Sequence, residues 1–161
     1  MNLHIDTQKL EEFYSTATLS TYAGGGNYIK SLRKGFKELE YKDGDWYYRD
    51  SYTGFYRSGG QEVIYFKEVP VFVVSYRGGM IEDHLHNLSF TNETFNFLKK
   101  ALSQKEDNFT PRGPEKFQSG DFVYQAKWEG NIEGFKGIEE IAYKGTIVFT
   151  HDFFGGIIIG K

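Results

Sequence analysis

One acidic residue, Asp50, falls in a row of aromatic side chains on a predicted strand. Side chains alternate between the two faces of a strand, so Asp50 shares its face with Trp46, Tyr48 and Tyr52. Burying an unpaired carboxylate costs several kcal/mol and raises its pKa toward neutrality, as a general acid or base requires. In the structural alternative, Asp50 lies near a sheet edge and reaches water or bonds neighbouring tyrosines.

A histidine has a comparable position near the end of the chain. His151 shares a predicted strand face with Phe149 and Phe153, where a hydrogen-bonded core histidine is the commoner role. If the two halves of the chain pack face to face, Asp50 and His151 approach each other and form an acid–base pair. That pair would suit a hydrolase or isomerase, although no G-x-S-x-G motif marks a serine nucleophile.

A ligand-binding site is the other interpretation of this region. Arg77 precedes Gly78 and Gly79, and the second half of the chain has Phe154 at the matching place. Arg77 and Asp50 are therefore features of the first half alone. Aromatic walls with a few fixed polar groups are typical of small-molecule pockets. The predicted ligand-binding residues are Trp46, Tyr48, Asp50, Tyr52 and Arg77.

Other groups of residues give weaker predictions of a functional site. Glu62 and Glu140 recur in the two halves, and a carboxylate pair could serve glycoside hydrolysis, but nothing in the sequence sets their separation. His84 and His86 have the spacing of a metal-site fragment without an identifiable third ligand. The chain has no cysteine, which excludes disulfides and cysteine-ligated zinc. We predict no metal site and no cofactor.

These candidates lie on an internal repeat. The segment Gly44-Asp45-Trp46-Tyr47-Tyr48 reappears as Gly120-Asp121-Phe122-Val123-Tyr124, and the similarity continues to the end of each half. Most repeated positions are turn glycines, aromatic residues and apolar residues at period two, which describe a strand-and-turn scaffold. We predict one domain over 1–161, with repeats over about 7–81 and 91–158.

Each repeat is predicted to start with a helix and to continue as an antiparallel meander. The helices are expected over 7–18 and 92–103. The expected caps are Asp6 or Thr7 for the first helix and Thr91 or Asn92 for the second. Strands are expected over 38–42, 45–53, 61–67, 70–77, 115–118, 121–129, 139–143 and 146–153. The fold class is therefore α+β, packed into one sheet or a barrel-like body.

Composition narrows the class of protein. The chain has 161 residues, of which 18% are aromatic and 25% charged, typical of a globular domain with a real core. A net charge of −3 argues against direct binding of nucleic acid, which needs a concentrated positive field. The first residues lack a signal-peptide pattern, and no apolar stretch is long enough to span a membrane. We expect a soluble, cytoplasmic protein.

The chain resembles a bacterial family known as domain of unknown function 5680. The resemblance covers nearly the whole chain. It rests on Thr21-Tyr22-Ala23, Leu39-Glu40-Tyr41, Gly44-Asp45-Trp46, Asp50-Ser51-Tyr52, Pro70-Val71, Gly78-Gly79, Arg112-Gly113-Pro114 and Gly120-Asp121-Phe122. Family members also occur behind an XRE-type helix-turn-helix, which implies a sensor or effector-binding role. Residues 1–35 contain no such domain, so DNA binding is not inferred, and the family supplies no catalytic residues.

The leading functional prediction is a non-enzymatic, sensor-like module that binds a small molecule in an aromatic pocket. A hydrolase or isomerase using Asp50 and His151 is the enzymatic alternative. A protein-interaction module, with a homodimer as one form, is the third. No nucleic acid and no membrane are expected as direct partners.

Overall fold

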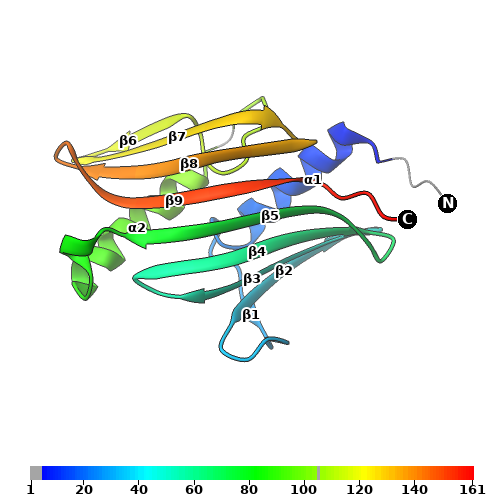
Figure 1. The fold of residues 1–161 in the computed structure, drawn as a ribbon, viewed down its shortest axis with the longest axis horizontal. Coiled ribbons are helices and arrows are strands. Elements are labelled where there is room, and N and C mark those ends of the chain that lie inside the picture. The colour runs from blue at the N-terminus through cyan, green and yellow to red at the C-terminus, as the bar shows by residue number, and fades with distance from the viewer. Residues whose placement is uncertain (1–4, 105) are drawn as a thin grey trace.

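The computed structural model describes residues 5–104 and 106–161. Two α-helices, α1 (Thr7–Ser20) and α2 (Leu88–Leu102), lie on the same face of one β-sheet (Figure 1). A short 3-10 helix, η1 (Glu82–His84), leads into α2. In the described part of the chain, no helix is long and apolar enough to cross a membrane.

The sheet has nine antiparallel strands in the order β1-β2-β3-β4-β5-β9-β8-β7-β6. The strands are β1 (Tyr28–Ile29), β2 (Lys37–Asp43), β3 (Trp46–Gly54), β4 (Arg57–Phe66), β5 (Val69–Met80), β6 (Lys116–Ser119), β7 (Phe122–Asn131), β8 (Gly134–Tyr143) and β9 (Thr146–Ile157). The α+β class and the single antiparallel sheet are confirmed. The barrel-like alternative is wrong, because β1 and β6 are free edges that do not pair with each other.

The two halves of the sheet meet where β5 pairs with β9. The helix α1 packs against β2 and β3, and α2 packs against β6 and β7, so the helices cover the two flanks of the sheet. Their apolar sides contribute to two core clusters. One includes Leu10, Phe13 and Ala17 of α1, and the other includes Phe97 and Leu98 of α2. The centre of the sheet therefore lies between the helices.

The cap of the second helix differs from the prediction. The helix α2 begins at Leu88 and is capped by Asn87, whose side chain accepts a hydrogen bond from the Phe90 amide, 3.2 Å away. Asparagine caps as well as threonine does, and Thr91 is instead buried inside the helix.

The turn between β4 and β5 is tight. Lys67 and Glu68 both adopt positive φ, as a two-residue hairpin turn requires.

Candidate functional site

A cavity of about 230 Å³ lies between the two helices and the centre of the sheet. Its wall combines tyrosines with buried polar residues. They include Tyr14, Thr18, Thr21, Tyr22, Tyr28, Tyr48, Asp50, Tyr52, Glu62, Tyr76, Phe95, Lys99, Arg112, Phe149 and His151. Tyr28 and Lys37 line the cavity and are exposed, so that end faces solvent.

Asp50 lies on β3 with only 3% of its surface exposed. The predicted alternation along this strand is confirmed, because Tyr48 and Asp50 are both buried. The Tyr76 hydroxyl donates a hydrogen bond to Asp50 Oδ1 over 2.9 Å. Burial, followed by the nearby charge of Glu62, raises the pKa of Asp50 to about 7. The carboxyl group therefore changes charge near neutral pH.

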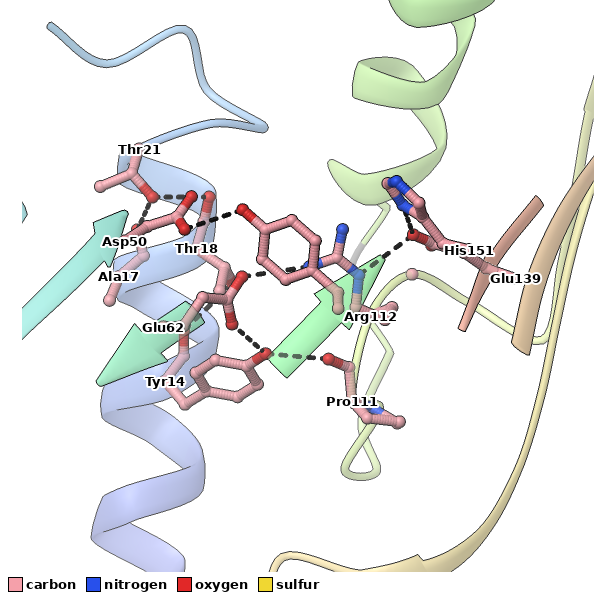
Figure 2. A network of polar contacts seen from close by, with 12 residues as sticks. Tyr14, Ala17, Thr18, Thr21, Asp50, Glu62, Pro111, Arg112, Glu139 and His151 are labelled. Carbon is pink, nitrogen blue, oxygen red and sulfur yellow. Dashed lines mark hydrogen bonds and ion pairs between the residues drawn. The ribbon is translucent and has the colours of Figure 1, made fainter. Parts of the chain in front are cut away.

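Arg112 joins the carboxylates of the two halves of the sheet (Figure 2). Its Nη1 lies 3.1 Å from Glu62 Oε1, and its Nε lies 3.1 Å from Glu139 Oε1. The guanidinium also lies over the Tyr76 ring, 4.9 Å from the ring centroid. A single buried cation thus serves two buried carboxylates.

The loop that carries Arg112 is held from both sides. The Tyr14 hydroxyl of α1 lies 2.9 Å from the Pro111 carbonyl oxygen and 2.8 Å from Glu62 Oε2. On the other side, the Gly113 amide donates to the Tyr124 hydroxyl over 3.1 Å. The loop between α2 and β6 is therefore fixed where it enters the core, which positions the guanidinium.

Glu139 organises the second half of the site. It accepts a 2.6 Å hydrogen bond from the Tyr124 hydroxyl, and His151 Nδ1 lies 3.0 Å from its Oε1. Burial alone would raise the pKa of Glu139, but Arg112 and then His151 lower that pKa to about 2. Because Glu139 is an ionised acceptor, His151 Nδ1 carries a proton.

The other ring nitrogen of His151 has no hydrogen-bond partner among the described residues. His151 is 5% exposed, its Nε2 is buried, and the residue lines the cavity. In the neutral ring with a proton on Nδ1, Nε2 is a hydrogen-bond acceptor. The Glu139–His151 pair therefore supplies either an acceptor for a ligand or a general base.

Asp50 and His151 line the same cavity without touching. The Tyr76 ring lies between them, hydrogen-bonded to Asp50 and 5.7 Å from the imidazole centroid. Figure 2 shows them on opposite sides of the Arg112 guanidinium. The partner of His151 is Glu139, because β8 places Glu139 directly opposite His151 on β9. Asp50 and His151 therefore share a cavity but do not form the predicted acid–base pair.

The other predicted ligand-binding residues divide into two groups. Tyr48 and Tyr52 line the cavity with Asp50. Trp46 lies outside it, packed between Phe13 and Phe66 at centroid distances of 5.5 and 4.5 Å. Arg77 is exposed, because it follows the inward-facing Tyr76 and therefore points to the opposite face of the sheet.

The sequence repeat pairs Glu62 with Glu140, but the structural counterpart of Glu62 is the preceding residue, Glu139. On β3 and β4, Asp50 lies opposite Glu62, and on β7 and β8, Ala126 lies opposite Glu139. A comparison by strand register therefore matches Glu62 with Glu139, whereas Glu140 faces the other side of the sheet. The alternation of buried residues along β8 was the signal that could have identified Glu139.

Arg112 and Tyr14 were not predicted as site residues. The one signal for Arg112 in the sequence is its position between Pro111 and Gly113 in an otherwise polar loop. Its burial could not be predicted, because it depends on tertiary packing. His84 and His86 pack against the rings of Phe90 and Tyr56, respectively. Within residues 5–104 and 106–161, no cluster of three or more His, Asp or Glu residues could hold a metal ion.

Comparison with known proteins identifies a family. The model of the family described as Domain of unknown function (DUF5680) matches residues 50–158, which include Asp50, Glu62, Arg112, Glu139 and His151. No curated protein and no solved structure matches the chain.

Proposed function

The chain belongs to the family of domain of unknown function 5680, and we propose that it binds a small organic molecule in the cavity between its helices and its sheet. The central observation is that His151 lines the cavity and that its buried Nε2 has no hydrogen-bond partner among the described residues. An unsatisfied buried polar atom costs about 1–3 kcal/mol, and a bound ligand would remove that cost.

The composition of the wall supports the same proposal. Tyrosine and phenylalanine rings provide apolar surface, while Asp50, Glu62, Arg112 and His151 are held in place by hydrogen bonds and ion pairs. Small-molecule sites are typically largely preformed, with few polar groups on an apolar wall. A preformed site loses little entropy when its ligand binds.

The size of the cavity limits the ligand. A cavity of roughly 150 Å³ holds benzene, so about 230 Å³ corresponds to roughly nine non-hydrogen atoms by proportion. This is one ring with a short substituent, or an aliphatic molecule of similar volume. Larger molecules would have to extend through the exposed end near Tyr28 and Lys37.

Thermal unfolding with a metabolite library tests this proposal. A ligand at a hundredfold its dissociation constant adds about 2.7 kcal/mol, or roughly 5–11 °C for a domain near this size. We expect hits on the wild type that weaken in Asp50→Asn and in His151→Gln. The matched control is Asp152→Asn, the same change at an exposed residue of β9, which should keep every hit. Hits unaffected by both cavity variants would place the ligand elsewhere and contradict the proposal.

Acid–base catalysis is the second candidate, favoured by the polarity of the same cavity. The pKa of Asp50 is about 7, and Glu139 orients the His151 imidazole. Together these groups could move a proton in a hydrolase or isomerase. Compounds found by thermal unfolding can be assayed for turnover against pH. A rate that vanishes in His151→Gln while binding persists would favour an enzyme, and binding without turnover would favour a sensor.

A further inference from the structure

We propose that the ligand is an organic cation, an amine on a small aromatic or apolar body, with its ammonium group at Asp50. This inference rests on the proposed binding function and specifies its chemical class. Three observations support it: the charge of the buried groups, the direction of their hydrogen bonds and the aromatic wall.

Acidic residues outnumber basic residues at the buried end of the cavity. Asp50, Glu62 and Glu139 are each less than 5% exposed, and Arg112 forms ion pairs with Glu62 and Glu139. In the described part of the chain, Asp50 forms no ion pair. An ion-pair partner stabilises a buried charge. A cationic ligand could be that partner for the carboxylate of Asp50.

Two hydroxyl groups of the cavity wall have no hydrogen left to donate to a ligand. Thr18 and Thr21 line the cavity together with Asp50. The Thr21 hydroxyl donates to the Ala17 carbonyl over 2.8 Å, and the Thr18 hydroxyl donates to the Tyr14 carbonyl over 3.0 Å. A hydroxyl has one hydrogen, so these oxygens can only accept from the cavity.

The acceptors on the cavity wall favour a ligand that donates hydrogen bonds. Thr18, Thr21 and Asp50 line the cavity and offer acceptor oxygens. The Tyr76 hydroxyl donates to Asp50, and Arg112 donates to the two glutamates. An ammonium group has three donors and no acceptor, which complements this set.

The remaining charges near the cavity are two lysines. Lys99 Nζ lies 5.2 Å from the centroid of the Tyr22 ring, and Lys37 Nζ lies 5.9 Å from that of Tyr28. Lys37 is exposed and Lys99 half-exposed, so water and salt screen their charges. Tyrosines line this cavity, and the face of an aromatic ring attracts a cation.

A trio of ligands that differ in charge tests the inference on the wild-type protein. The probes are 2-phenylethylamine, 2-phenylethanol and phenylacetate, which share one ring and nearly the same size. Isothermal titration at pH 8 should show the amine binding at least about tenfold more tightly than the alcohol, and phenylacetate binding weakest. Between pH 8 and 6 the affinity for the amine should fall, because protonation of Asp50 removes its partner. The affinity for the alcohol should stay constant.

The variant Asp50→Asn should weaken amine binding by about tenfold to a hundredfold and change alcohol binding little. The control Asp152→Asn should bind all three probes as the wild type does. The pH series needs no variant, so it tests the inference even if Asp50→Asn folds poorly.

The outcomes separate this inference from the proposed function. Alcohol or phenylacetate binding as tightly as the amine would overturn the cation and leave small-molecule binding intact. If only neutral or anionic library compounds occupy the cavity, the cation is likewise overturned and small-molecule binding stays intact. If neither the three probes nor any library compound binds, both the inference and the proposed function fail.

Discussion

Asp50 is held in the folded protein at the expense of stability. Its carboxyl group titrates near 3.9 in an unfolded chain and at about 7 in the folded protein. The folded state therefore binds this proton more tightly. Stability attributable to Asp50 falls as the pH rises from about 4, and the full loss is reached above about 7. Residues kept at such a cost are common at functional sites.

We predict that Asp50→Asn is more stable than the wild type at pH 8. Asparagine can keep the hydrogen bond from Tyr76 without the buried charge, so the gain should be roughly 2–4 kcal/mol. The gain should fall to about a quarter of that value at pH 4.5. Urea unfolding at the two pH values measures it, and Asp152→Asn should match the wild type within about 0.5 kcal/mol. Equal stability of the wild type and Asp50→Asn at pH 8 would contradict the burial of an unpaired charge.

Glu139 should have the opposite effect on stability. Glu139→Gln removes one of the two carboxylate partners of Arg112 and the carboxylate partner of His151, and losing buried hydrogen bonds to a charged group costs about 1–3 kcal/mol. Its neighbour provides a control, since Glu140→Gln changes the opposite face of β8 and should cost less than about 0.5 kcal/mol. Urea unfolding at pH 7 compares them. Similar losses in the two variants would mean that the register of β8 is wrong.

At the scale of the elements, most of the correct predictions came from the period-two alternation of apolar and polar residues along the strands. It identified β3 and β7 within one or two residues and placed Asp50 on the buried face. Alternation is local, so it works without tertiary information. The partners of Glu139 and Arg112 depend on the register of β8 and on the path of a loop, which no local pattern encodes. The duplication itself stays a prediction, although each half has a helix followed by antiparallel strands.

The start of α2 gives an element-scale prediction. Asn87→Ala removes the cap that accepts from the Phe90 amide and should cost about 1 kcal/mol. Asn92→Ala tests the cap expected from the sequence. Asn92 is exposed inside the helix, where alanine is the better helix former, so this variant should lose nothing. Thermal unfolding without ligand distinguishes the two, and a larger loss in Asn92→Ala would contradict the cap at Asn87.

The whole molecule depends on the pairing of β5 with β9. Gly78 adopts φ 152° in this ladder, and a Cβ atom there would collide with the carbonyl oxygen of Thr150. We predict that Gly78→Ala costs roughly 2–4 kcal/mol. Gly134→Ala is the control, because a Cβ atom at Gly134 would meet no atom within 4 Å, and its effect should be under about 1 kcal/mol. Chemical unfolding of both variants measures the difference, and equal stabilities would show that the ladder tolerates a side chain there.

The same ladder governs when the cavity comes into existence during folding. The residues that β5 and β9 bring together are on the order of 75 positions apart in the sequence, and such distant pairings form slowly because a long loop must close first. The helices and hairpins on either side can form earlier from local contacts. Asp50 and His151 come from opposite sides of this ladder, so a nascent chain acquires their common pocket only after β9 has been synthesised and paired. A ligand would then find no target in a partly folded intermediate, and its effect would fall mainly on the rate at which the finished protein unfolds.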